Sequence, residues 1–257
     1  MDRPNPNGNG SRTSTTGRAC SIPHRDIELT ETCPVHGRPK MQRVYEGSFA
    51  GRFTWCPDCE SEKTRHNLRQ SRRQRRETLR DAVYVTIPPR YRQARLCHIS
   101  RPVREAIQRA PADAGAVLFG PVGAGKTYTL AAFARHWIVL GDSVRRASWD
   151  GLLRDVRSSY SGGSSEESII GNYTRPSRLI VEDLGASTPV NAEETAFSVR
   201  ILTAILDYRL EQCRPTYITT NRTQRDIGKS FDARVASRLQ LLAWIGIGGR
   251  DNRTVTR

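Results

Sequence analysis

The pattern of apolar and polar residues changes near Gly115 of this 257-residue chain. Beyond that point, short apolar runs alternate with longer segments in which apolar residues recur at helical spacing. The clearest example is residues 116–119, which we predict to be a buried strand, followed by a helix over 126–140. Strands that alternate with helices in this way are typical of an α/β protein with a parallel sheet.

The same alternation continues through the C-terminal part of the chain. Further strands are predicted at 144–149, 179–181, 216–219 and 243–247. Further helices are predicted at 149–160, 192–212 and 234–242. We expect the last strand at an edge of the sheet. The predicted fold class is therefore α/β, with a parallel five-stranded sheet.

Three other segments precede this α/β domain, which we assign to residues 111–257. Residues 1–25 are rich in Asn, Pro, Gly, Ser and Thr, and they carry too little apolar surface to offset the entropy of ordering, so we expect them to be disordered. Residues 26–62 contain few aliphatic side chains, which is typical of a small module that needs a cross-link. Residues 63–110 are predicted to form a basic helical linker.

Positive charge dominates the composition and is concentrated before the α/β domain. The chain has 41 Lys and Arg against 26 acidic residues, a formal net charge of +15. Residues 60–109 hold 14 of these basic residues and 5 acids, and Pro88 and Pro89 interrupt any helix that runs through them. One interpretation is that this segment follows the phosphates of single-stranded DNA, with Tyr84 and Tyr91 stacking on bases. The other is a solvated, Arg-rich helix that only links two modules.

Composition also excludes several classes of protein. No apolar run approaches the roughly 18 to 20 residues that cross a bilayer, so we expect neither a membrane-spanning segment nor a membrane partner. The N-terminal residues lack the apolar stretch of a secretory signal, and 6 cysteines are too few for a disulfide scaffold in a chain of this length. We therefore expect reduced thiols and a cytoplasmic protein.

A glycine-rich segment between the first strand and the first helix fits the pattern G-x-x-x-x-G-K-[ST] of a P-loop. Its glycines permit backbone conformations that turn N–H groups toward a phosphate, and the following helix adds its positive N-terminus. The lysine would contact the outer phosphates of ATP and the threonine hydroxyl would hold Mg²⁺. The alternative is a glycine-rich turn that binds nothing. The predicted cofactor-binding residues are Gly120, Pro121, Val122, Gly123, Ala124, Gly125, Lys126 and Thr127.

Polar residues also follow two later strands. Glu182 and Asp183 end the strand at 179–181, where carboxylates could hold the nucleotide's metal and position a water molecule. Asn221 follows the strand at 216–219 and could orient the attacking water. Each has a simpler interpretation, because acidic residues and Asn are also common in ordinary loops and turns.

Four metal-type residues stand in two matched pairs before the basic segment. Cys33 and His36 are followed, after nineteen residues, by Cys56 and Cys59. Two such pairs can close a tetrahedral zinc site, and four protein ligands would make the Zn²⁺ structural. Free thiols or a disulfide are the alternatives, and the spacing alone also permits a DNA-binding finger.

Four segments together resemble the AAA+ helicase-loader family of bacteria and phages, the DnaC-like and IstB-like ATPases. They are FGPVGAGKT, LIVEDLGA, LDYRLEQCRPTYITTN and DARVASRL, with weaker matches in IPPRYRQARL and WDGLLRDVRSSY. The resemblance assigns Lys126 and Thr127 to Walker A, Glu182 and Asp183 to Walker B, and Asn221 to sensor 1. It also assigns Arg238 as an arginine finger. That side chain would reach a neighbouring subunit's nucleotide, although pairing with acids of its own chain is the alternative.

The resemblance implies an AAA+ P-loop core with a reduced lid that binds ATP and Mg²⁺ and self-associates when ATP is bound. It implies a loader that places a replicative helicase, a DnaB-like hexamer, on single-stranded DNA, with ATP as the switch between assembly and release. The N-terminal zinc module would grip the helicase. Arg253 is a candidate for a sensor-2-like residue.

One departure from the family pattern concerns the acidic pair. The family usually has Asp-Asp or Asp-Glu where this chain has Glu182 and Asp183, so slow hydrolysis is expected. Two other functions stay open. The first is an IstB-type helper ATPase of transposition, and the second is a zinc-containing nucleic-acid-binding protein that does not hydrolyse ATP.

Overall fold

The computed structural model describes residues 24–45, 51–162, 164–189 and 192–248. The chain forms two units, residues 1–74 and 75–257, and the division between them falls within helix α1 (Pro57–Thr86). Arg253 and most of the expected disordered lead-in lie outside the described residues. Within the described ranges, no helix combines the length and the apolar character needed to cross a lipid bilayer.

Unit 1 contains a three-stranded antiparallel sheet that the hydrophobic pattern did not predict. Its strands are β1 (His24–Thr32), β2 (Pro39–Tyr45) and β3 (Gly51–Trp55). Most described side chains of β1 are exposed, so this strand lacks the alternation of apolar and polar residues that identifies a half-buried strand. Cys33 follows β1 and Cys56 follows β3, so the hairpins bring distant cysteines to one end of the sheet.

Unit 2 is built on a five-stranded parallel sheet, which confirms the predicted fold class. The order across the sheet is β5-β6-β7-β4-β8, so the last strand lies at an edge, as expected. The strands are β4 (Gly115–Phe119), β5 (Val144–Ser148), β6 (Arg178–Glu182), β7 (Thr216–Thr220) and β8 (Ala243–Gly246).

Helices connect these strands, and the predicted ones are all present within a few residues of their expected ends. The helix predicted at 126–140 has those bounds, and its flanking residues Gly125 and Gly141 have φ angles of 93° and 102°. Two short helices, α5 and α7, were not predicted, and α2 lies within the segment that was predicted as a helical linker. The helices that follow α1 are α2 (Arg101–Gln108), α3 (Lys126–Leu140), α4 (Trp149–Ser158), α5 (Glu166–Thr174), α6 (Ala196–Glu211), α7 (Gln224–Ser230) and α8 (Ala233–Gln240).

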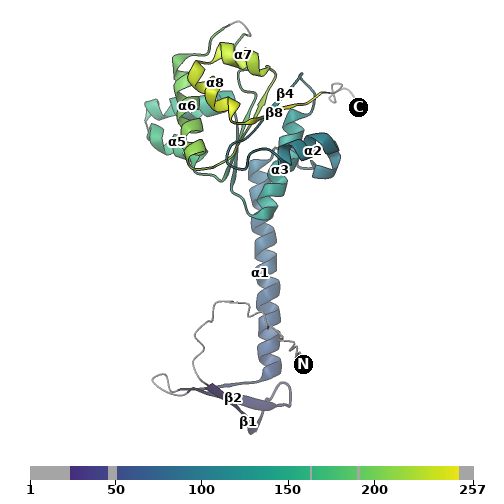
Figure 1. Cartoon of the computed structure of the whole chain (residues 1–257). Coiled ribbons are helices and arrows are strands. Elements are labelled where there is room, and N and C mark those ends of the chain that lie inside the picture. The colour runs from purple at the N-terminus through teal and green to yellow at the C-terminus, as the bar shows by residue number, and fades with distance from the viewer. Residues whose placement is uncertain (1–23, 46–50, 163, 190–191, 249–257) are drawn as a thin grey trace, which may run out of the picture. The chain divides into compact units, whose positions relative to one another are not determined.

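The sheet of unit 2 has an apolar layer on each face because successive strand residues point to opposite sides. Val117 and Ile218 pack with α4, α6 and α8 in one buried cluster. Leu118 and Tyr217, one position away in each strand, pack with α3 in the other cluster. Figure 1 shows α3 and α6 on opposite sides of the sheet. Both faces are covered, as burial of nearly continuous apolar strands requires.

The segment predicted as a basic linker takes part in this packing. Helix α1 ends at Thr86, before the two prolines that were expected to stop it. Val83, Ile87 and Ile107 then join the apolar cluster that covers the α3 face of the sheet. The C-terminal end of α1 and the residues through α2 are therefore part of the core of unit 2.

A fully buried arginine joins the two segments that lead into strands β6 and β7. Arg209, on α6, donates hydrogen bonds to Thr216 Oγ1 at 2.9 Å, Pro215 O at 2.7 Å and Pro176 O at 2.9 Å. It also donates to the carbonyls of Tyr173, Thr174 and Ser177. All these acceptors are neutral, and burial, with a smaller effect of the Arg214 charge, lowers the pKa of Arg209 to about 10.

Replacing Arg209 with Met should destabilise unit 2 by about 3 kcal/mol or more, because several buried carbonyls lose their donor. Urea unfolding followed by circular dichroism measures the change. Arg154, which is exposed on α4, supplies the matched control, and Arg154→Met should change the free energy of unfolding by less than about 0.5 kcal/mol. Equal effects of the two substitutions would contradict the stabilising role of Arg209.

Candidate nucleotide site and metal centre

The loop between β4 and α3 has the backbone geometry of a phosphate cradle. Gly120, Gly123 and Gly125 have φ angles of 147°, 80° and 93°, which side chains rarely allow. A Cβ atom at Gly120 would lie 2.1 Å from the carbonyl oxygen of Ile247, so the close approach of these two backbone segments requires glycine there. The loop leads directly into α3, whose N-terminal N–H groups favour an anion.

Lys126 connects this loop to the end of β7. The lysine is buried, and its Nζ donates to Gly120 O at 2.7 Å, to Pro121 O at 2.8 Å and to Asn221 Oδ1 at 2.7 Å. Lys126 and Asn221 are 95 positions apart in the sequence, and both were predicted site residues. The structure brings them into contact. Thr127 follows in the first turn of α3 and is half-buried.

The acidic pair lies at the same edge of the sheet, at the carboxyl end of β6. Glu182 is buried, whereas Asp183 is exposed and has a φ angle of 57°, in the left-handed region. The Asp183 N–H donates to Thr219 Oγ1 at 2.9 Å and the Leu184 N–H donates to Thr219 O at 2.9 Å. These bonds fix the turn after β6 against β7. Thr219 was not among the predicted residues, since only the strand order makes it a neighbour of Asp183.

Glu182 has a partner that the sequence analysis missed. Arg146, on the neighbouring strand β5, forms an ion pair with Glu182 through Nη2 and Oε2. Burial raises the pKa of Glu182 to about 7; the Arg146 charge opposes this shift and the Asp183 charge adds to it. The sequence analysis predicted the strand that carries Arg146 but not this partner, because the contact depends on the pairing of β5 with β6.

Arg238 is paired within its own chain in this structure. Its guanidinium forms an ion pair with Asp207 of α6, with Nη2 at 2.8 Å from Oδ2, and donates to Arg234 O at 2.9 Å. In the single chain, Arg238 therefore pairs with an acid of its own chain, which was the alternative to the finger role. The finger role concerns a neighbouring subunit and stays a prediction.

Arg222, the residue after Asn221, is a second arginine that the sequence analysis missed. It is buried and donates to Ser230 Oγ of α7, to Thr188 O and, at 3.2 Å, to Pro189 O. Arg222 thus ties the loop that follows the acidic pair to the segment that carries Asn221. No local pattern marks a single arginine for such a role.

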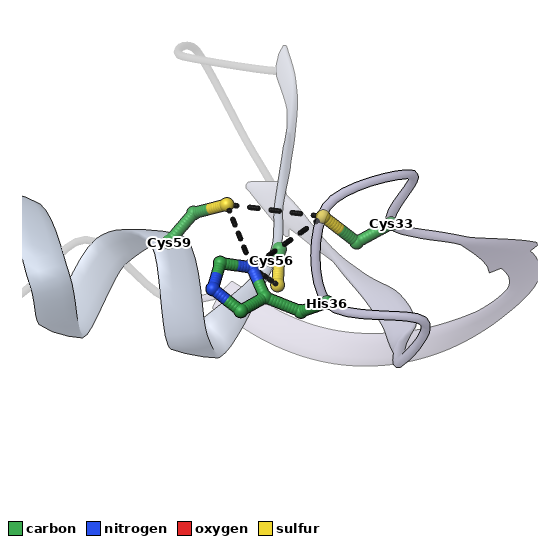
Figure 2. A group of neighbouring side chains, drawn as sticks. All are labelled: Cys33, His36, Cys56 and Cys59. Carbon is green, nitrogen blue, oxygen red and sulfur yellow. Dashed lines mark hydrogen bonds between the residues drawn. The ribbon is translucent and has the colours of Figure 1, made fainter.

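The four metal-type residues of unit 1 meet at one point (Figure 2). Cys33 Sγ lies 3.8 Å from Cys59 Sγ, and His36 Nδ1 lies 3.8 Å from Cys33 Sγ, 3.8 Å from Cys56 Sγ and 3.3 Å from Cys59 Sγ. Zinc–sulfur bonds of about 2.3 Å place tetrahedral sulfur ligands about 3.8 Å apart, so these donor atoms fit a zinc ion. Cys33, Cys56 and Cys59 are all free thiols, so no disulfide forms among them.

The surroundings of these donors suit a cation as well. Hydrogen bonds from His36 lower the pKa of the Cys33 thiol to about 6, which favours the thiolate that binds metal, whereas desolvation and hydrogen bonds with Cys33 and Cys56 raise the pKa of Cys59 to about 11. The other ring nitrogen of His36 lies 3.5 Å from Glu62 Oε1, and a carboxylate in that position orients a metal-binding histidine. Glu62 lies close to Cys59 on α1 and was not predicted, because an acid on an exposed helix is common.

The cradle, the acidic strand end and Asn221 at one edge of a five-stranded parallel sheet are the features of a P-loop ATP-binding domain. The family model for the IstB-like ATP binding protein matches residues 100–240, which is more than half of the chain. The chain therefore belongs to the IstB-like family of ATP-binding proteins, as the resemblance indicated.

Individual proteins agree with this assignment. The replicative helicase loader DnaC of Escherichia coli K12 is 24% identical over 140 residues, which cover 54% of this chain and 55% of DnaC. The chain thus matches about half the length of this curated relative. The crystal structure of the DnaC helicase loader aligns with a TM-score of 0.52 at 17% identity, covering 63% of this chain and 100% of that one. AMPPCP-bound DnaA from Aquifex aeolicus aligns with a TM-score of 0.54 at 16% identity, covering 65% and 53%. These two structures show the shared fold.

The zinc site can be tested by metal content. We expect the purified chain to hold one Zn²⁺ per molecule by mass spectrometry, and Cys59→Ser to lose most of it because three ligands bind zinc far more weakly. Limited proteolysis should then cut residues 24–62 while unit 2 stays intact. Cys213→Ser is the matched control, since Cys213 is an exposed cysteine outside the cluster. Zinc retained in Cys59→Ser, or absent from the unchanged protein, would contradict the site.

The nucleotide site can be tested at its lysine. Lys126→Ala removes the cation that faces the loop, so ATP affinity should fall at least tenfold without loss of fold. Titration with a fluorescent ATP analogue measures affinity, and circular dichroism checks the fold. Lys229→Ala, at an exposed lysine of α7, should leave affinity within about twofold of the unchanged protein. Unchanged affinity in Lys126→Ala would reject the site.

Proposed function

We propose that this protein is an ATPase that loads a replicative helicase, a DnaB-like hexamer, onto single-stranded DNA. The observation that carries the proposal is the contact of Lys126 with both the P-loop and Asn221 in a chain that resembles a helicase loader. That contact brings a phosphate-binding cation and a polar group that can orient water to one site. The proposed location is the cytoplasm, where a helicase loader works.

The proposed roles of the site residues follow from their positions. Backbone N–H groups of residues 120–127 would surround the phosphates of ATP, with Lys126 between the outer ones. The Thr127 hydroxyl and the Glu182 carboxylate would hold Mg²⁺, which supplies neutralising charge when bound. Asp183 and Asn221 would position the attacking water. Because a glutamate stands at position 182, where the family usually has aspartate, we propose that hydrolysis is slow.

Arg238 would act between subunits of an ATP-dependent oligomer. In the chain alone Asp207 satisfies its guanidinium, so the finger must exchange this partner for a neighbour's γ-phosphate. An exchange of one anionic partner for another keeps the arginine paired in both states. ATP would in this way favour assembly, and hydrolysis would favour release of the helicase.

Single-stranded DNA is proposed as the second partner because three arginines of unit 2, Arg92, Arg95 and Arg135, lie close together. Arg95 Nη1 and Arg135 Nη1 donate to the same carbonyl, Arg92 O, at 3.3 Å and 2.8 Å. The Arg92 guanidinium lies over the ring of Tyr84, 4.2 Å from its centroid. Among the described residues, none of these three arginines forms an ion pair with a carboxylate. Phosphates of a strand would relieve their mutual repulsion.

The zinc module is proposed as the part that grips the helicase, a role that the family resemblance implies. A specific observation also favours a second function. The family model that matches residues 100–240 is that of IstB-like proteins, so a helper ATPase of transposition with the same core is the alternative. A non-hydrolysing nucleic-acid-binding protein is the third candidate, and it predicts no turnover with DNA.

The proposal is tested by ATP turnover on single-stranded DNA and by retention of the host's hexameric replicative helicase on that DNA. Arg238→Ala alone and Lys126→Ala alone should each lose at least tenfold in turnover, because one lacks the finger and the other the nucleotide site. Mixing the two should restore part of the activity, since each supplies what the other lacks at shared interfaces.

Arg234→Ala is the matched control for the finger, because Arg234 lies one turn before Arg238 on the same helix. It should keep turnover near that of the unchanged protein. A mixture that stays inactive would reject the finger. Normal DNA-stimulated turnover without helicase retention would leave the transposition helper as the better reading.

A further inference from the structure

The ion pair between Arg146 and Glu182 lies at the proposed metal site, and the P-loop mechanism does not require it. The two residues come from adjacent parallel strands, where Ser148 is the register partner of Glu182. Their side chains are 15% and 7% exposed. Such a pair costs desolvation of two charges and is weak evidence for stability alone, so its position suggests another role.

Each partner keeps one buried polar atom without a hydrogen bond. Glu182 Oε2 accepts from Arg146 Nη2, whereas Glu182 Oε1 and Arg146 Nε have no partner within the described part of the chain. Buried polar atoms nearly always have a hydrogen-bond partner or bind an ion. A carboxylate oxygen without a hydrogen bond can serve as a ligand of a divalent cation. Arg146 therefore holds one oxygen of Glu182 and leaves the other for a metal.

The pairing also accounts for the type of residue at position 182. An aspartate would be shorter by one methylene, so its carboxylate would draw back from the Arg146 guanidinium on the neighbouring strand. The contact with Arg146 therefore requires the longer side chain of glutamate at position 182. A loss of either partner would leave the other charge buried and unpaired.

We propose that Arg146 is a positioning residue for the nucleotide's divalent cation: it holds Glu182 Oε2 so that Oε1 faces the metal. This inference rests on the proposed function, since it concerns the same nucleotide site. Arg146 acts through Glu182 alone, so its contribution appears in the metal-dependent part of ATP binding and not in binding of the phosphates by the loop.

The test compares affinity for a fluorescent ATP analogue in Mg²⁺ and in EDTA. Arg146→Gln should reduce the gain in affinity that Mg²⁺ provides by about tenfold, as loss of a residue that orients a metal ligand does, and should leave affinity in EDTA within about twofold. Glu182→Asp should show the same loss. In the double variant the aspartate should cost less than about twofold beyond Arg146→Gln, because the pairing is already gone.

Two further variants separate positioning from folding. Arg145→Gln, at the exposed neighbour on β5, should leave the Mg²⁺ effect unchanged. Arg146→Lys keeps a cation at this position and should recover part of the effect, and it carries the comparison if the glutamine variant does not fold.

The outcomes distinguish this inference from the proposed function. If the unchanged protein binds the analogue with no Mg²⁺ effect, or does not bind it, the proposed function fails together with the inference. If the unchanged protein shows the Mg²⁺ effect and Arg146→Gln or the folded Arg146→Lys keeps it in full, the inference alone is overturned. Losses that multiply in the double variant would also overturn it, because independent residues behave in that way.

Discussion

The parallel pairing of β4, β6 and β7 is the constraint on which the nucleotide site depends. It places the carboxyl ends of three strands at one edge, so a loop, an acidic pair and an asparagine from distant parts of the chain become neighbours. The pairing is kept close by glycine: at Gly115 a Cβ atom would lie 2.2 Å from the carbonyl oxygen of Thr216. Apolar layers on both faces then hold the sheet, and the polar groups are left at its rim.

Local patterns were sufficient to predict much of unit 2. A helix over 126–140 and the apolar runs of the strands are short-range signals, and the P-loop is a contiguous motif. The residues that local patterns did not indicate are those that act across the chain. Arg146 meets Glu182 through strand order and register, and Asp207 meets Arg238 through the packing of two helices. Neither contact leaves a periodic mark in the sequence.

Unit 1 shows the same limit in another form. The spacing of four ligand residues predicted a metal site, and the structure gathers their donor atoms within 4.8 Å of one another. The strands between those ligands were missed because their described side chains are mostly exposed, so no buried face imposes an alternation. In a module of this kind, ligand geometry supplies the order that an apolar core supplies in unit 2.

The hydrogen bonds of Lys126 have a consequence for which ligands the loop accepts. An ammonium group has three protons, and Gly120 O, Pro121 O and Asn221 Oδ1 already receive hydrogen bonds from it. A ligand must therefore compete with these three acceptors for the hydrogen bonds of Lys126. A molecule with a single weak acceptor cannot replace them. Selectivity for chains of charged oxygens thus begins with the hydrogen bonds that Lys126 forms within its own chain.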